Sequence, residues 1–442
     1  INELEESVIT HCLNAAEKIR ADDQIAKTIT VFIRTSPFDK SRKYYSNSKT
    51  IDLAIPTSNS LELIKNAIKA LNDIYKYGYS YQKAGIILSG LKNADQNDQN
   101  LLKLCEIQGN VLLNESGYIT SKAYSKLDSN YKLSLKSIEY SDGKDGNQGG
   151  LGILRMGQGD EQSVLIMKYG VHGMGHGHFD KLHFIYFDQN KEIINDYGFS
   201  RWVNVEPKFG GRYLPENDSY AKSTVAHNTV VVNMINQNQG NRKKADTVHG
   251  VRHYFYGEDE KVKIMSAKSY EHYPNVKMQR TMLFIDDDKL EFPVVLDVFR
   301  LESNESNTYD YPIHYSGQII NTNFKYEKHI SSMKALGSDN GYEHIWEEAN
   351  GKVDEPLKIT WLDGQKYYSI IASVDKKSEM IFGRIGANDP KYNLRSEPMF
   401  IFRKVAKDYV FASVVETHGY FNEASESSRN TVGYIEKVIV VG

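Results

Sequence analysis

Cysteine is scarce in this 442-residue chain: Cys12 and Cys105 are the only two, and they lie in segments that share no pattern. A disulfide framework needs several paired cysteines and a thiolate metal site needs a cluster of them, so we expect neither. Any metal ion would therefore be held by histidine and carboxylate side chains. No apolar run reaches the roughly eighteen residues that a membrane-spanning helix requires, and we expect no membrane partner.

Net charge and proline are also low. The 54 basic and 57 acidic side chains leave a formal net charge of -3, which gives no global reason to expect a nucleic-acid partner. Ten prolines stand against thirty tyrosines and seventeen phenylalanines, a balance that favours β structure over much of the chain. The chain is long for one hydrophobic core, so we expect more than one domain.

Residues 1–92 have the pattern of a small α+β domain. Apolar residues recur at helical spacing over residues 4–19, and again over residues 61–74 after the hydroxyl-rich segment 57–60, which is typical of a helix N-cap. Strand-like stretches lie at 28–36, 51–56 and 84–88. Residues 93–104, which begin with the polar string NADQNDQN, are predicted to form a linker.

The strings AAEKIRADDQIAKTITVFIRTSPF and AIPTSNSLELIKNAIKALNDIYKYGYSYQKAGIILSGL resemble the C-terminal little-finger region of UmuC-type translesion DNA polymerases. In that family the region grips the DNA backbone, so the resemblance implies weak DNA binding by residues 1–92. The catalytic carboxylates of such polymerases lie in another domain, and no polymerase activity is implied. Because the segment is only slightly basic, a solvated α+β surface without a nucleic-acid partner is the alternative.

Residues 105–442 are predicted to form a large antiparallel β-sandwich. Strand-length segments rich in β-branched and aromatic residues recur to the C terminus, among them VLIMKYG, HFIYFD, FPVVLDVF and YVFASVVE. Helical periodicity is nearly absent after residue 135, and no short repeat indicates a propeller or a solenoid. We therefore expect a mainly β protein in which a small α+β domain precedes the sandwich.

Residues 170–184, GVHGMGHGHFDKLHF, contain four histidines among four glycines. Histidine titrates near neutral pH and is the commonest metal ligand, and glycine lets the backbone and a ligand approach closely. The segment therefore indicates a polar site and not a packed core.

His178, Asp196 and His227 are predicted to meet at the ends of neighbouring strands. A hairpin over residues 184–196 would bring His178, expected on a strand, beside Asp196, and His227 precedes the strand-like string NTVVV. Two imidazoles and a carboxylate with an open fourth position suit zinc. The alternative is that ordinary hydrogen bonds satisfy each side chain. His183 is an odd number of strand positions from His178, so we expect it to point away.

The strings KYGVHGMGHGHFDKLHFIYFD and IINDYGFSRWVNVEPKFGGRYLPENDSYAKSTVAHNTVVVN resemble the C-terminal sheet domain of heparinase II/III-like polysaccharide lyases, most of all oligoalginate lyases. The resemblance covers about residues 105–442, and several motifs agree in order and spacing. It implies that His178, Asp196 and His227 bind Zn²⁺, which would tie strands together and not activate water.

The same resemblance assigns roles to four further residues. It implies that His176 and Tyr213 are catalytic and that Arg201 and His172 bind the substrate. Each of the last three also has an ordinary explanation. Tyr213 is one of thirty tyrosines and suits packing, Arg201 suits a cation–π pair with Trp202, and His172 suits a structural role.

These residue types suit β-elimination of a 4-linked uronic acid. A base removes the C5 proton, a cation or amide stabilises the charge that develops on the carboxylate, and an acid protonates the departing O4. The resemblance thus implies a polysaccharide lyase that acts on an acidic oligo- or polysaccharide, with alginate oligomers favoured. In the family, an N-terminal α/α toroid forms the opposite wall of the site. Residues 1–92 do not resemble one, so we expect an incomplete lyase.

Two other functions stay open for a chain that combines these two resemblances as a chimera. One is a carbohydrate-binding sandwich without turnover, and the other is a DNA-binding polymerase fragment fused to a passenger domain. The resemblances also imply different locations, because the lyase part suggests a periplasmic or secreted protein and the polymerase-like part a cytoplasmic one.

Overall fold

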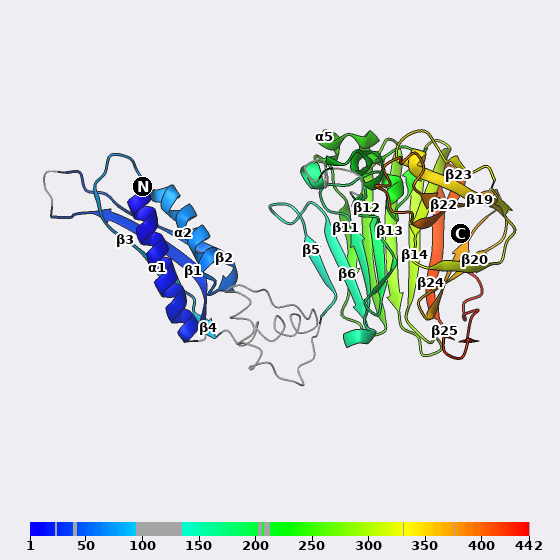
Figure 1. The fold of residues 1–442 in the computed structure, drawn as a ribbon, viewed down its shortest axis with the longest axis horizontal. Helices are drawn as coiled ribbons and strands as arrows, with labels where there is room; N and C mark the ends of the chain where they lie inside the picture. The colour runs from blue at the N-terminus through cyan, green and yellow to red at the C-terminus, as the bar shows by residue number, and fades with distance from the viewer. Residues whose placement is uncertain are drawn as a thin grey trace. The chain divides into compact units, whose positions relative to one another are not determined.

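The computed structural model describes residues 1–22, 24–38, 42–93, 135–201, 206, 213–329, 331–375 and 377–441. The chain divides into two compact units, Ile1–Leu133 and Ser134–Gly442 (Figure 1). The predicted linker lies outside the described residues apart from Asn93, so its boundaries stay a prediction. Among the helices of the described segments, none has the length and apolar character that crossing a membrane would require.

Two helices cover one face of an antiparallel sheet in the N-terminal unit, as Figure 1 shows. The helices are α1 (Asn2–Ala21) and α2 (Ser60–Ile74). The sheet has the order β2-β1-β3, with β1 (Gln24–Thr35), β2 (Ser46–Thr57) and β3 (Tyr81–Ser89), and the short β4 (Lys92–Asn93) pairs with β1. The predicted small α+β domain is confirmed.

Alternation along β1 divides this sheet into a buried face and an open face. Ile29, Val31 and Ile33 are fully buried in the hydrophobic core that α1 and α2 complete. Helix α2 begins at a cap of a different kind from the one predicted. The side chain of Asn59 accepts hydrogen bonds from the backbone N–H groups of Leu61 and Glu62, so an amide oxygen and not a hydroxyl caps the helix.

An eight-stranded sheet, named here the large sheet, forms one layer of the C-terminal unit. Its strands are, in spatial order, β11 (Val251–Tyr256), β12 (Val262–Tyr273), β13 (Val276–Ile285), β14 (Val294–Ser303), β24 (Tyr409–His418), β21 (Lys366–Ser373), β20 (Leu357–Asp363) and β16 (Gln318–Thr322). All neighbouring pairs are antiparallel.

Two further sheets pack against the large sheet. The opposing sheet consists of β10 (Val231–Val232), β15 (Asn307–His314), β23 (Pro398–Ala406), β22 (Ser378–Ile385), β19 (Ile345–Val353) and β17 (Glu327–Lys328), with β18 (Lys334–Ala335) also paired to β19. The meander sheet consists of β5 (Ile138–Ser141), β6 (Gly150–Met156), β7 (Ser163–Lys168), β8 (His183–Asp188) and β9 (Lys191–Ile194). An isolated bridge between Ile194 and Tyr315 links these two sheets.

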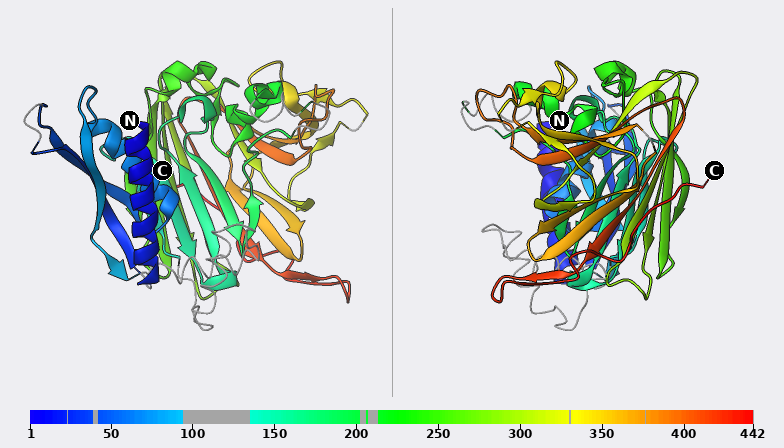
Figure 2. Two further views of the ribbon diagram at one scale, coloured as in Figure 1. Left: turned by 60° about the vertical axis from the view of Figure 1, so that its left-hand side comes forward. Right: turned by 90° about the vertical axis from the view of Figure 1, so that its right-hand side faces the viewer.

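One hydrophobic core draws on all three sheets, for example through Leu165 of β7, Met278 of β13 and Phe400 of β23. Figure 2 shows these strands from two further sides. The hairpin β25 (Tyr420–Asn422) and β26 (Ser427–Arg429) stands apart from them. The helical turns are short: η2 (Gly159–Glu161), η3 (Met174–His176), η6 (Asn217–Ala221), η7 (Thr224–Ala226), η8 (Gln237–Gly240), α5 (Arg242–Ala245) and η9 (Tyr342–His344). The predicted antiparallel β-sandwich is confirmed.

Candidate active site and metal centre

The histidine-rich segment forms a loop at one end of the meander sheet. Strand β7 ends at Lys168 and β8 begins at His183, so His172, His176 and His178 all lie in the connection between them. The expected strand position of His178 is therefore wrong, because regular pairing with β7 begins only at His183.

Glycine allows this loop to fold back on itself. A Cβ atom on Gly177 would stand 1.8 Å from the carbonyl oxygen of His172, so any larger residue would force the two segments apart. Gly173 has a φ of 90°, in the left-handed region that favours glycine. The fold leaves His176 exposed on η3, while His178, two residues later, is only 7% exposed. The loop thus directs one histidine outward and the next inward.

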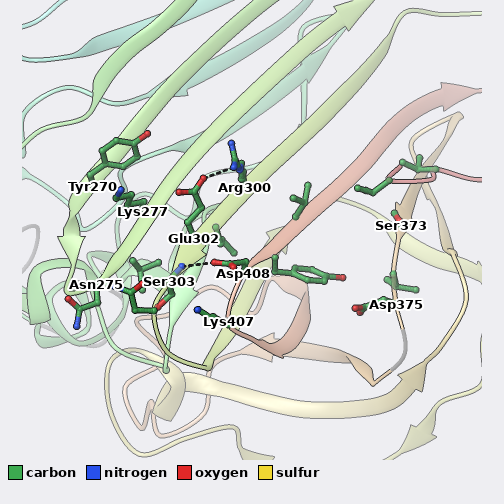
Figure 3. A pocket seen from close by; sticks show the side chains of 18 of the residues that line it. Tyr270, Asn275, Lys277, Arg300, Glu302, Ser303, Ser373, Asp375, Lys407 and Asp408 are labelled. Carbon is green, nitrogen blue, oxygen red and sulfur yellow. Dashed lines mark hydrogen bonds and ion pairs between the residues drawn. The ribbon is translucent and has the colours of Figure 1, made fainter. Parts of the chain in front are cut away.

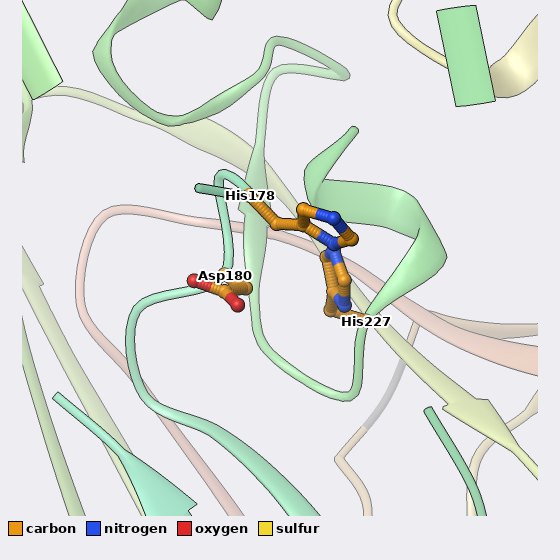
Figure 4. A group of neighbouring side chains, drawn as sticks. All are labelled: His178, Asp180 and His227. Atoms are coloured by element: carbon orange, nitrogen blue, oxygen red, sulfur yellow. The ribbon is translucent and has the colours of Figure 1, made fainter. Parts of the chain in front are cut away.

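His178 lies in this loop, and Asp196 and His227 come from two other segments that meet it. Asp196 follows β9, and the predicted hairpin is present, with Tyr186 of β8 opposite Ile194 of β9. His227 follows η7, and its Nδ1 lies 2.7 Å from Oδ1 of Asp196. The rings of His178 and His227 are 5.1 Å apart between centroids (Figure 4). The three predicted ligands are therefore neighbours.

Two groups of described side chains could each hold a metal ion, because the ligand atoms within each group all lie within 4.8 Å of one another. His227 belongs to both groups. One group adds His178 and Asp180, which Figure 4 shows beside His227, and the other adds His183 and Asp196. The predicted combination of His178, Asp196 and His227 draws on both groups and stays a prediction.

Asp180 is already neutralised by protein cations. Its two carboxylate oxygens lie 2.6 Å from Nζ of Lys168 and 3.1 Å from Nζ of Lys181. Burial would raise the pKa of Asp180, but the charges of these two lysines outweigh that effect and hold it well below its usual range. No such pair of lysines contacts Asp196 among the described ion pairs, so Asp196 is the better placed of the two carboxylates for a metal ion.

His183 belongs to this cluster, contrary to the expectation that it points away. Its Nε2 is 3.7 Å from Oδ1 of Asp196, and its ring centroid is 5.2 Å from that of His227. Strand alternation does not relate these two histidines, because His178 lies in the loop and His183 is the first residue of β8.

Hydrogen bonds fix how the imidazole rings present their nitrogens. The backbone N–H of Asn228 donates to Nδ1 of His183 over 2.9 Å, so a neutral His183 carries its proton on Nε2, toward Asp196. His227 uses Nδ1 for Asp196, which leaves its buried Nε2 without a hydrogen-bond partner. An unpartnered buried nitrogen on a ring oriented by a carboxylate is typical of a metal-binding histidine.

The protonation states also suit a metal ion. Burial lowers the pKa of His178 to about 4, with a further contribution from His227, and burial lowers the pKa of His183 to about 3. Burial would raise the pKa of Asp196, but the charges of His227 and His183 outweigh it and lower that pKa. Neutral imidazoles and an ionised carboxylate are the forms that bind zinc, so these residues fit the predicted ion.

The remaining predicted residues occupy different surroundings. His172 is 3% exposed and packs against Phe179 with ring centroids 5.0 Å apart, a burial that suits its structural alternative. Arg201 is exposed, and its Nε donates to the carbonyl oxygen of Tyr392 over 3.2 Å. Tyr213 is 63% exposed, and it precedes η6. Trp202, the suggested partner of Arg201, lies outside the described residues.

Two buried residues that the sequence reasoning missed hold this site together. The side-chain amide of Asn228 donates to the carbonyl oxygens of Phe184 and Asn195, each over 2.9 Å. Arg280 is fully buried and pairs with Asp297, and its Nη1 donates to the carbonyl oxygens of Leu182 and Asn228. A signal for Arg280 was present, since it occupies an inward position of the alternating string VKMQRTMLF.

Comparisons with known proteins match the two units separately. The family model described as "Heparinase II/III-like, C-terminal" matches residues 140–401, and the model described as "impB/mucB/samB family C-terminal domain" matches residues 1–101. Protein UmuC of Salmonella typhimurium is 40% identical over 86 residues, which is 20% of this chain and 20% of that protein.

Two alginate lyases match most of the chain. The exo-oligoalginate lyase of Saccharophagus degradans is 38% identical over 348 residues, covering 77% of this chain and 47% of that protein. The alginate lyase of Stenotrophomonas maltophilia is 37% identical over 357 residues, covering 79% of this chain and 47% of that protein. The chain spans about half the length of these two curated relatives.

Proposed function

Because the chain belongs to the heparinase II/III-like family through its C-terminal domain, we propose that it acts in the β-elimination of 4-linked uronic-acid glycans, with alginate oligomers as substrates. The names of its two lyase relatives support this substrate class. The observation that carries the proposal is the loop between β7 and β8, which exposes His176 to solvent two residues before His178, a member of the buried histidine cluster.

His176 is the proposed base and Tyr213 the proposed acid. His176 takes the C5 proton, the C–H electron pair becomes the C4–C5 double bond, and the C4–O4 bond breaks as Tyr213 protonates O4. Both side chains are exposed, as a residue that meets a polymer must be. Arg201 is the proposed partner of the uronate carboxylate, and its anchored position on the Tyr392 carbonyl supports that role. His172 is proposed to support substrate binding through the loop in which it is buried.

His178, Asp196 and His227 are the proposed zinc ligands. The 2.7 Å separation between Nδ1 of His227 and Oδ1 of Asp196, the neutral state of His178 and the ionised state of Asp196 support the assignment. Zinc would supply a rigid link between the histidine loop, the end of β9 and the segment after η7. His183, whose Nε2 lies 3.7 Å from Oδ1 of Asp196, would add a neutral ring beside that carboxylate.

An assay of the full chain with alginate oligomers tests the lyase proposal through the ultraviolet absorbance of the unsaturated uronate product. His176→Ala and Tyr213→Phe should each lower kcat by about 10² to 10⁴-fold, the usual contribution of one general acid or base. The matched controls His11→Ala and Tyr256→Phe remove an exposed histidine and an exposed tyrosine elsewhere and should leave kcat unchanged.

Metal analysis tests the zinc proposal separately. We expect about one zinc per chain as purified. His227→Ala should lose it, because only two of the three proposed protein ligands remain. A protein that contains no zinc and does not bind alginate oligomers would contradict the proposal. Oligomer binding with no product would favour the carbohydrate-binding sandwich in its place.

The open face of the N-terminal sheet favours a second function, and we propose that it binds duplex DNA weakly. Hydroxyls of Thr30 and Thr50 line this face, where their oxygens lie 2.8 Å apart. Arg34 of β1 stands opposite Lys83 of β3 on the same face. Hydroxyl and cationic side chains on an uncovered sheet suit phosphate contacts.

Fluorescence anisotropy of the full chain with labelled duplex DNA at several salt concentrations tests this second function. The double variant Arg34→Ala/Lys83→Ala should weaken binding and reduce the slope of log K against log salt by about 1 for each lost phosphate contact. The control Lys65→Ala/Lys69→Ala removes the same charge from exposed positions on α2. An equal effect of the two double variants would overturn the assignment to the sheet face.

A further inference from the structure

A hollow of about 1080 Å³ lies on the C-terminal unit, and it shares no residue with the histidine cluster (Figure 3). It opens on the outward face of the large sheet. On β13, Val276 and Met278 point into the core and are buried, whereas Lys277 between them is exposed and lines the hollow. Neighbouring strands, the turn at Lys407 and the C-terminal segment complete its walls.

The lining of the hollow is mixed in chemistry. Its polar side chains include those of Tyr270, Lys277, Arg300, Glu302 and Lys407. Apolar side chains that include those of Val374, Val410, Val438, Ile439 and Val440 also line it, and the last three belong to the C-terminal segment. A hollow of this size whose lining is more polar than apolar suits a hydrophilic ligand.

The carboxylates of the hollow are already engaged by the protein. Glu302 pairs with Arg300 at 2.6 Å, a contact drawn in Figure 3. Asp375 pairs with Lys404, and Asp408 accepts a hydrogen bond from the backbone N–H of Ser303 over 2.9 Å.

Lys277 and Lys407 are the cations that remain. Neither has a carboxylate within ion-pair distance among the described residues, and the ammonium of Lys277 lies 5.8 Å from the ring centroid of Tyr270. The backbone hydrogen bond leaves Asp408 charged, so once Glu302 and Asp375 are paired, the two lysines exceed Asp408 by one positive charge. A ligand that carries carboxylates would form ion pairs with the ammonium groups of both lysines.

We propose that this hollow is a second saccharide site, which takes an acidic oligosaccharide. The half-exposed ring of Tyr270 offers a flat surface for the C–H face of a pyranose, and the two ammonium groups pair with uronate carboxylates. The choice of a uronate polymer as ligand rests on the proposed function, and two sites on one polymer strand would raise its overall affinity.

Affinity electrophoresis of the full chain in native gels with sodium alginate tests the site without any need for turnover. The double variant Lys277→Ala/Lys407→Ala should weaken the retardation constant by about tenfold, since two charge-assisted contacts are lost. Product formation from an alginate trisaccharide by this variant should keep its wild-type rate, because the two substitutions lie outside the histidine cluster. Tyr270→Ala should also weaken retardation, with no change of charge.

The control Lys289→Ala/Lys352→Ala removes two exposed charges outside the hollow and should leave the retardation constant unchanged. Equal weakening by this control would overturn the site, because it would show a general charge effect. Unchanged retardation of the Lys277→Ala/Lys407→Ala protein would also overturn it, as would equal retardation of the wild type by neutral dextran. Absence of trisaccharide turnover would count against the lyase proposal alone, because the gels measure binding by themselves.

Discussion

The two units of this chain bury different kinds of side chain. Among the described buried residues of the N-terminal unit, Thr35 is the one polar side chain, and the rest of its core is apolar. The C-terminal unit buries many polar groups, which include the cations Lys181 and Arg280 and the acids Asp180 and Asp297. Burying such groups costs free energy unless hydrogen bonds and ion pairs compensate for it.

This difference separates two ways of carrying a function. Among the described residues of the N-terminal unit, the groups proposed to contact DNA lie on its open sheet face, apart from its apolar core. The C-terminal unit builds its candidate site into the interior, where Arg280 and Asn228 fix the loops by hydrogen bonds to their carbonyl oxygens. Its stability and its site therefore depend on the same residues.

Arg280→Ala should give the largest difference in stability between the two units. The substitution leaves Asp297 as a buried charge without its partner, which typically costs about 3 to 5 kcal/mol. Urea unfolding followed by tryptophan fluorescence reports this unit alone, because Trp202, Trp346 and Trp361 all lie in it. The urea midpoint of the fluorescence transition should fall. The loss of the helical circular dichroism signal of α1 and α2 should keep its wild-type midpoint.

The double variant Arg280→Met/Asp297→Leu separates the lost charge pair from the lost packing. It should destabilise less than Arg280→Ala, since no buried carboxylate remains unpaired. If Arg280→Ala lowered both transitions equally, the two units would not be independent and the contrast between their cores would lose its meaning.

Removal of the proposed zinc ion should have the next largest effect and should act on the same unit. A ligand that binds only the folded state at about 100 times its dissociation constant stabilises by about 2.7 kcal/mol, so a chelator should lower the tryptophan-monitored midpoint accordingly. His227→Ala should show no further shift with chelator. A chelator effect that persists in His227→Ala would place the ion elsewhere.

Much of this organisation was accessible from sequence because it depends on local periodicity. The helices of the N-terminal unit, its strands, the sandwich and the hairpin over residues 184–196 all follow from alternation or helical spacing. The position of Asp196 at the end of that hairpin also follows, whereas the loop position of His178 does not. The family match agrees with both resemblances.

What escaped prediction depends on contacts between distant segments. His183 was misplaced because no local pattern reveals that the glycine-rich loop replaces a strand before it. Asn228 gains its role from carbonyl oxygens more than thirty residues away, at Asn195 and Phe184. Arg280 did leave a local trace, a cation at an inward strand position, but its partners Leu182 and Asn228 appear only in the fold.

Asn59→Ala should have the smallest effect and should act on the other unit. Loss of its two hydrogen bonds to the first turn of α2 should cost about 1 kcal/mol, seen in the helical circular dichroism and not in tryptophan fluorescence. Ser58→Ala is the matched control, because the sequence pattern had placed a hydroxyl cap in this segment. If Ser58→Ala destabilised the helix as much as Asn59→Ala, the hydroxyl would share the cap. If Asn59→Ala instead shifted the tryptophan signal, the apolar N-terminal core would be coupled to the polar interior of the C-terminal unit.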